Sequence, residues 1–111
     1  MDLIQELWKI NDLLTKALEQ FKQRGIEYAK CYRNYRVLVA QELLRLKAEG
    51  MPVTIAYDIA RGNEQVADAK EKEIIAEALY KSCQEAIQTY KLQIRILQSQ
   101  INAEYNNGGD V

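Results

Sequence analysis

The stretch Ala48-Glu49-Gly50-Met51-Pro52-Val53-Thr54 decides the fold, because it ends one long helical pattern and precedes another. Gly50 suits the left-handed conformation that ends many helices, and a proline two residues later cannot continue the helix. The hydroxyl of Thr54 can then cap the next helix. The stretch therefore predicts a tight turn between two helices.

Before this turn, apolar residues recur every three or four positions, which is the period of an amphipathic helix and not of a strand. The repeat is clearest at Leu3, Leu7, Ile10, Leu14, Ala17 and Phe21. Beyond Gly25 we assign the main stripe to Ala29, Tyr32, Val39, Leu43 and Leu46, with Tyr28, Tyr35 and Leu38 beside it. The pattern predicts one helix over about residues 2–49, bent at Gly25 or, in the alternative, broken there.

After the turn, the repeat alternates strictly between three and four positions, as it does in coiled coils. Its members are Tyr80, Cys83, Ile87, Tyr90, Ile94, Leu97 and Ile101. This pattern predicts a second helix over about residues 55–105, followed by a disordered tail at 106–111. Gly62 and Asn63 leave an alternative open, in which a short helix ends at Arg61 and Asn63 caps a long one.

Two helices of this length, joined by a short turn, lie antiparallel to each other. The predicted fold class is therefore all-α: a coiled-coil-like hairpin of two long helices, forming one domain over residues 1–105. One seam cannot bury all of its apolar residues, because Ile74, Ile75, Leu79, Leu92 and Ile96 lie beside the strict repeat. We expect a homo-oligomer, most simply a dimeric four-helix bundle, and we assign its interface to the strict repeat Tyr80–Ile101. The alternative is that the extra face binds another protein.

The charge pattern has two interpretations. The net charge is −1, so the chain as a whole has no electrostatic affinity for nucleic acid. The first interpretation pairs bases of the first helix with acids of the second, Arg33 with Glu71 and Arg36 with Asp68. The second is a surface where tyrosines stack on unpaired bases and cations hold phosphates. That surface would comprise Lys22, Arg24, Lys30, Arg33, Arg36, Tyr28 and Tyr32.

Histidine and several motifs that commonly carry enzyme chemistry are missing from this sequence. Histidine, the commonest general base and metal ligand, does not occur. The two cysteines, Cys31 and Cys83, lack zinc-site spacing, and no phosphate-binding loop is present. We therefore expect a protein that is not an enzyme and that binds no metal and no cofactor.

Targeting signals also look absent. Asp2 and Glu6 occupy the region where an export signal carries basic residues. No apolar run reaches the length of a membrane span. We expect a cytoplasmic protein with reduced thiols and no membrane partner.

Asp58 and Arg61 lie just after the turn and are not explained by the helical repeat. Their spacing of three fits a simple ion pair on one helix. The alternative is that they form a partner-binding tip, since function concentrates on loops that a rigid scaffold presents.

Several segments together resemble small helical proteins encoded by phages and prophages of Gram-positive bacteria. They are Gly50-Met51-Pro52-Val53-Thr54, Asp58-Ile59-Ala60-Arg61-Gly62, Ala78-Leu79-Tyr80-Lys81, Glu85-Ala86-Ile87 and Tyr90-Lys91-Leu92. The resemblance spans roughly residues 25–105 and includes no catalytic signature. It implies a place in the cytoplasm of the host bacterium and a role in phage DNA metabolism or in handling a host factor.

Three functions follow as hypotheses. The first is a non-enzymatic interaction protein that self-associates by helix packing and binds a protein partner. The second is an accessory nucleic-acid-binding factor in phage DNA replication or recombination. The third is an inhibitor of a host defence or DNA-processing enzyme, which would act by protein packing because the chain is not acidic enough to mimic DNA.

Overall fold

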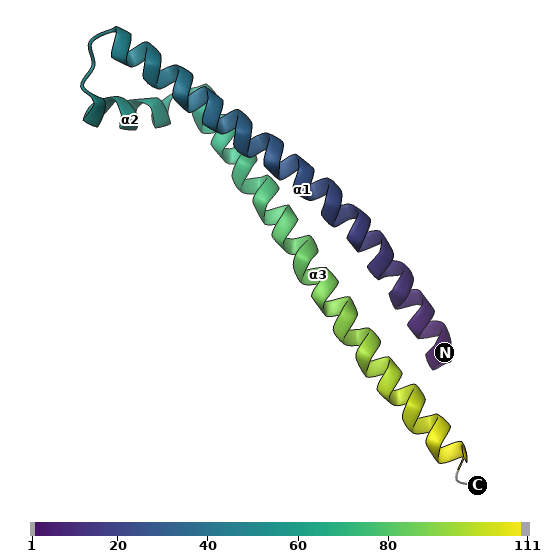
Figure 1. Ribbon diagram of the computed structural model, residues 1–111. Helices are drawn as coiled ribbons and strands as arrows, with labels where there is room; N and C mark the ends of the chain where they lie inside the picture. The colour runs from purple at the N-terminus through teal and green to yellow at the C-terminus, as the bar shows by residue number, and fades with distance from the viewer. Residues whose placement is uncertain (1, 110–111) are drawn as a thin grey trace. The chain divides into compact units, whose positions relative to one another are not determined.

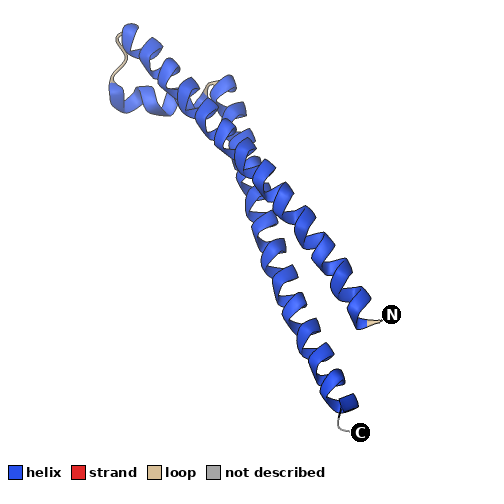
Figure 2. Cartoon of the chain, turned by 45° about the vertical axis from the view of Figure 1, so that its right-hand side comes forward, coloured by secondary structure: helices blue, strands red, loops and turns tan. Residues whose placement is uncertain are grey.

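A computed structural model describes residues 2–109 and contains three helices within that range (Figure 1). Helix α1 spans Leu3–Ala48, α2 spans Val53–Gly62 and α3 spans Glu64–Gly109. Every described residue lies in a helix or in a short connection (Figure 2). The predicted all-α fold, a hairpin of two long antiparallel helices, is confirmed.

The turn after α1 follows the predicted chemistry. Gly50 has a φ of 84°, in the left-handed region. Its amide donates to the carbonyl of Lys47 at 3.0 Å, and the amide of Met51 donates to that of Leu46 at 3.1 Å. These two hydrogen bonds form a Schellman motif, which satisfies carbonyls that the helix end leaves free.

The start of α2 differs from the prediction. Pro52 is the N-cap residue and makes no side-chain capping bond. Thr54 already lies inside the first turn of α2, so the prediction that its hydroxyl caps this helix is wrong. A proline suits this place because its fixed φ is compatible with helix entry and because the missing N–H costs nothing there.

The second helical segment is interrupted at Asn63. This residue has ψ 133°, an extended value, and its Oδ1 accepts hydrogen bonds from the amides of Gln65 at 2.9 Å and Val66 at 3.2 Å. Asn63 therefore caps α3, and the alternative of a short helix before a long one is the arrangement that forms. Helix α3 also runs through residues 106–109, which the sequence assigned to a disordered tail; residues 110–111 lie outside the described residues. Neither Asn nor Gly removes a backbone donor as Pro does, so a helix can continue through them.

The chain divides into two compact units. The turn unit comprises residues 24–80: the second half of α1, all of α2 and the first part of α3. The terminal unit comprises the described residues of 1–23 and 81–111: the start of α1 and the rest of α3.

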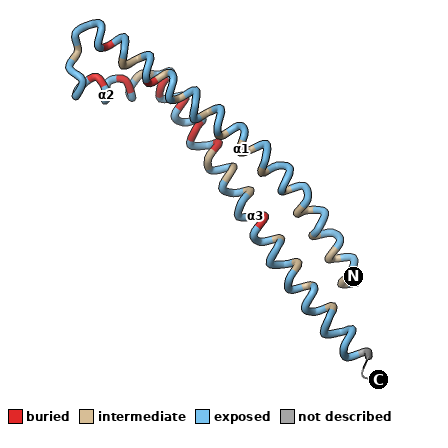
Figure 3. The backbone as a smooth tube through the Cα atoms, viewed as in Figure 1, coloured by how far each residue is buried: buried red, intermediate tan, exposed pale blue. Residues whose placement is uncertain are grey.

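The turn unit holds the better-formed core. Leu46 of α1 and Ala56 and Ala60 of α2 are buried together, and Leu43 and Met51 pack against them. Figure 3 shows buried positions along α2 and the first part of α3. The small alanine side chains let the α2 backbone lie close to its neighbours, so a ten-residue helix can seal this end of the seam.

In the turn unit, the seam of α1 differs from the stripe we assigned beyond Gly25. Tyr28, Cys31, Tyr35 and Leu38 are half-buried, whereas Ala29 and Tyr32 are exposed. The reason is that α1 runs unbroken through Gly25, so its three-and-four repeat continues without a change of phase. Gly25 leaves room for a ring of α3, because a Cβ at this position would lie 3.1 Å from Cε1 of Tyr80.

In the terminal unit, the predicted stripes are the ones that pack. The six residues from Leu3 to Phe21 in the first repeat are all half-buried, as are Cys83, Tyr90, Ile94, Leu97 and Ile101 of α3. Ile87 is the one buried residue among those described in this unit. Two helices alone cover a seam from two directions only, so most of its side chains stay partly open to solvent.

Candidate functional site

The residues of the strict repeat Tyr80–Ile101 pack against the other long helix of the same chain. The sequence analysis assigned these seven residues to an interface between chains, yet each is half-buried or buried in the single chain. The rings of Tyr80 and Tyr28, for example, are 5.9 Å apart. In a hairpin, the stripe of each long helix is covered first by the other helix of the same chain. The repeat is therefore partly covered within one chain, and its assignment to an interface between chains stays a prediction.

Apolar residues that flank the repeat are exposed in the terminal unit. On α3, Leu92 and Ile96 are 54% and 50% exposed, and on α1 Trp8 is 68% exposed. Ile4 and Leu18 of α1 are exposed as well. Scattered exposed apolar residues are ordinary, but several beside one seam indicate a surface that another helix can cover.

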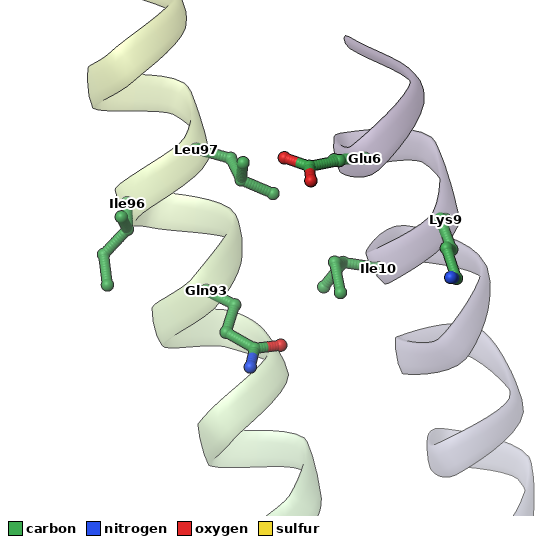
Figure 4. Close-up of a pocket in the computed structure, with 6 residues that line it drawn as sticks. All are labelled: Glu6, Lys9, Ile10, Gln93, Ile96 and Leu97. Atoms are coloured by element: carbon green, nitrogen blue, oxygen red, sulfur yellow. The ribbon is translucent and has the colours of Figure 1, made fainter. Parts of the chain in front are cut away.

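A groove of about 350 Å³ lies between α1 and α3 of the terminal unit. Figure 4 shows that Ile10 and Glu6 of α1 point toward Leu97 and Gln93 of α3 across this groove. Lys9 and Ile96 complete its lining. Within the described residues, neither Glu6 nor Lys9 forms an ion pair. The groove thus combines an apolar floor with two unpaired opposite charges.

The basic stretch of α1 does not pair with α3 as predicted. Across the described residues, no ion pair involves Lys22, Arg24, Lys30, Arg33 or Arg36. The ion pairs that do form join neighbours on one helix, such as Arg45 with Glu42 and Glu49. The predicted pairing of Arg33 with Glu71 and of Arg36 with Asp68 is therefore wrong.

The reason is the face of α1 on which these basic residues lie. Seam residues of α1 in the turn unit include Tyr28 and Cys31, whereas Lys30 and Arg33 are exposed and point away from the seam. Lys30, Arg33, Asn34 and Val37 line a shallow hollow of about 280 Å³ on that outer face. Lys30 and Arg33 therefore lie on the solvent-exposed face of α1.

The two tyrosines of the predicted nucleic-acid surface have different surroundings. The hydroxyl of Tyr28 donates to Oε2 of Glu77 at 3.0 Å, and its ring packs on Tyr80. Tyr28 therefore packs between α1 and α3 and is not available to stack on a base. Tyr32 is 46% exposed, and the guanidinium of Arg36 lies 6.0 Å from the centre of its ring. Only Tyr32 is placed to stack on an incoming base.

Asp58 and Arg61 of α2 form no ion pair with each other among the described residues. The guanidinium of Arg61 instead lies 4.8 Å from the ring centre of Tyr57. A residue four positions back is as near as one three back, so the ring displaces the carboxylate as its partner. The same helix exposes Val53, Ile55 and Ile59 while its alanines face inward.

The surroundings of the Cys31 thiol favour its protonated form. Burial, and then a hydrogen bond from Sγ of Cys31 to Oε1 of Glu27 at 3.6 Å, raise the pKa of the Cys31 thiol. A raised pKa keeps the sulfur protonated and therefore weakly nucleophilic. Cys83 is a free, half-buried thiol. In residues 2–109, no group of three or more Cys, Asp or Glu side chains is arranged to hold a metal ion.

One acid of the seam was not recognised as special from the sequence. Glu73 is 5% exposed, and its Oε2 accepts a hydrogen bond from Nζ of Lys70 at 3.1 Å. That hydrogen bond raises the pKa of Lys70. Continuing the strict repeat backward from Tyr80 by four and then three positions reaches Ala76 and Glu73, which was the available signal that a carboxylate would face the seam.

No protein-family model, no curated protein and no solved structure matches this chain. Over the described residues, none of the helices has both the length and the hydropathy that a membrane-spanning helix needs.

Proposed function

We propose that this chain is a non-enzymatic interaction protein that self-associates by helix packing. The observation that carries the proposal is the set of exposed apolar side chains around the groove of the terminal unit, above all Trp8, Leu92 and Ile96. Fully burying an exposed Leu or Ile side chain contributes about 1.5–3 kcal/mol, and covering Leu92 or Ile96, which are 54% and 50% exposed, contributes about half of that. Four such side chains in a symmetric pair, two from each copy, therefore give a substantial driving force for association.

A second copy of the chain is the occupant that fits this surface. A groove between two helices accepts a third helix, and this chain supplies helices with the matching three-and-four repeat. A twofold axis makes each contact occur twice, so the unpaired Glu6 of one copy can meet Lys9 of the other, and the reverse. The two charges then fix the register of the assembly.

Solution mass tests this proposal. We expect light scattering to give a dimer for the unmodified chain, and a monomer for the double variant Leu92→Asp with Ile96→Asp. Both positions are exposed in the single chain, so circular dichroism should show the same helix content. The matched control changes Gln84 and Gln88 to Asp, also four apart and exposed on α3. A monomeric unmodified chain, or a dimeric Leu92/Ile96 variant, would contradict self-association.

Beyond self-association, the exposed Val53, Ile55 and Ile59 of α2 support a protein partner. The phage setting that the sequence resemblance implies makes a host or phage protein the natural candidate. If that partner is a host defence or DNA-processing enzyme, the chain would inhibit it by packing on its surface.

The basic side chains of α1 that form no ion pair within the described residues support a second candidate function, that of an accessory nucleic-acid-binding factor. Each phosphate contact adds about 0.9 to the slope of log affinity against log salt on duplex DNA. We expect the variant with Lys30, Arg33 and Arg36 changed to Gln to flatten that slope. A variant with Lys91 and Arg95 of α3 changed to Gln is the control. No binding of single- or double-stranded DNA at low salt would remove this candidate.

A further inference from the structure

Three helices of the turn unit bring polar side chains to one hollow. Tyr35 of α1, Arg61 of α2 and Lys70 of α3 line it, and its volume is about 310 Å³. Val66, which is 2% exposed, forms the apolar part of the lining. Residues far apart in the sequence thus place a phenol, a guanidinium and an ammonium group around one space.

The two cations are held in place but are not fully neutralised. Nζ of Lys70 lies 4.7 Å from the ring centre of Tyr35, and the guanidinium of Arg61 rests on Tyr57. Lys70 gives one hydrogen bond to Glu73, and Arg61 forms no ion pair with a described residue. Lys70 is thus partly neutralised by Glu73, which is buried on the seam side, and at longer range by Glu77, whereas Arg61 keeps its full charge.

Unused hydrogen-bond donors remain at this hollow. A guanidinium has five N–H donors in a planar fork, and an ammonium has three, of which Glu73 takes one. The Tyr35 hydroxyl adds a donor from α1. The stacked rings limit the motion of both cations, which lowers the entropy cost of fixing them on a ligand.

We propose that the hollow lined by Tyr35, Arg61 and Lys70 binds a phosphoryl group. A phosphoryl group is tetrahedral, so its oxygens can accept hydrogen bonds from three helices at once. An arginine fork beside a lysine is the pairing that phosphate favours, since the fork binds two oxygens and the ammonium acts as a point charge. The hollow is larger than one phosphate, which leaves space for the group that carries it.

This phosphoryl site is independent of the proposed self-association. It lies wholly in the turn unit, whereas the self-association surface lies in the terminal unit. The loss of one function therefore leaves the other measurable, because dimer mass reports on Leu92 and Ile96 and phosphate binding reports on Arg61.

Thermal unfolding with inorganic phosphate tests the site, with chloride used to match the ionic strength. We expect phosphate to raise the Tm of the unmodified chain and of the control variant Arg95→Gln, whose arginine is exposed in the terminal unit. In Arg61→Gln the affinity should fall at least about tenfold, because a charge-assisted hydrogen bond is lost. Arg61→Gln leaves Lys70 and Glu73 paired, so folding should persist. No rise in the unmodified chain, or an equal rise in Arg61→Gln, would overturn the proposal.

The source of the phosphoryl group is resolved by two further ligands, a nucleoside monophosphate and a single-stranded oligonucleotide without terminal phosphates. A small phosphorylated ligand is the source if the monophosphate binds through Arg61 while oligonucleotide binding ignores the Arg61→Gln change. A nucleic-acid backbone is the source if the oligonucleotide binds more tightly than the monophosphate and loses that affinity in Arg61→Gln. Tyr35→Phe keeps the ring under Lys70 and should lower the affinity for phosphate severalfold through loss of the hydroxyl alone.

Discussion

The turn unit and the terminal unit carry the same three-and-four repeat, but they bury different amounts of it. Eight of the nine buried residues that the structure describes lie in the turn unit, where α2 adds a third helix. In the terminal unit only α1 and α3 meet, and Ile87 alone is buried. The difference shows that a two-helix seam leaves its flanks open until another helix covers them. A second copy would supply such helices to the terminal unit.

The largest expected effect is in the core of the turn unit. Leu46→Ala should lower the free energy of unfolding by about 2–5 kcal/mol, because it leaves a cavity beside Ala56 and Ala60. Leu44→Ala, at a position that is 68% exposed on the same helix, should change it by less than about 0.5 kcal/mol. Urea unfolding followed by circular dichroism measures both. Similar losses in the two variants would mean that this core does not carry the stability of the unit.

The corresponding change in the terminal unit is Ile87→Ala. We expect a loss of about 2 kcal/mol, at the low end for such changes, because the open seam can collapse or admit water. If the chain self-associates, the measured stability should rise with protein concentration in the unmodified chain. Urea unfolding midpoints measured at several protein concentrations check this. Midpoints that do not vary would mean that no second copy covers the terminal unit.

Two glycines of the turn unit should respond in opposite directions. Gly62→Ala should raise stability by about 0.5–1 kcal/mol, since it is helical and a new Cβ would have no neighbour within 4 Å. Gly50→Ala should lower it by about 1 kcal/mol, because φ is +84° there. Thermal unfolding of the two variants measures both changes. A shift of Tm in the same direction for both variants would contradict the prediction.

The smallest effect concerns the two thiols, one in each unit. In a Cys83→Ser background, Cys31 should react with iodoacetamide at pH 8 more slowly than free cysteine does. The sign follows from its raised pKa, which leaves a smaller fraction of thiolate at any pH below that pKa. Its rate should also keep rising at higher pH, after the rate of free cysteine has levelled. A rate at pH 8 equal to that of free cysteine would show that burial and the hydrogen bond to Glu27 do not protect Cys31.

The sequence predicted the features that depend on local chemistry. The turn at Gly50 that ends α1 and the seam residues from Leu3 to Phe21 could be read directly, because turn chemistry and helical period are local signals. The break at Asn63 stayed open, because its capping side chain and the continuing repeat favour different structures. Beyond Gly25, Ala29 and Tyr32 look as apolar as Tyr28 and Cys31, so composition alone could not choose the stripe.

Features that join different helices were not predictable in this way. Arg33 and Arg36 matched the acids of α3 in number, but the pairing required knowing which face of α1 they occupy. The convergence of Tyr35, Arg61 and Lys70 likewise depends on where α2 lies after the turn. Only Arg61 of these three had been singled out, and for its position beside the turn.

The short connection after Ala48 also sets an order of events in folding. Leu46 and Ala56 are 10 positions apart in the chain, whereas Glu6 and Leu97, which face one groove, are 91 apart. Closing the longer loop from an unfolded chain costs about 2 kcal/mol more in chain entropy. Once the core around Leu46 has formed, each further turn of α1 and α3 needs only a short closure. We expect folding to begin at the turn and the pairing of α1 with α3 to extend from there toward the chain ends. Substitutions that destabilise the turn unit should therefore slow folding.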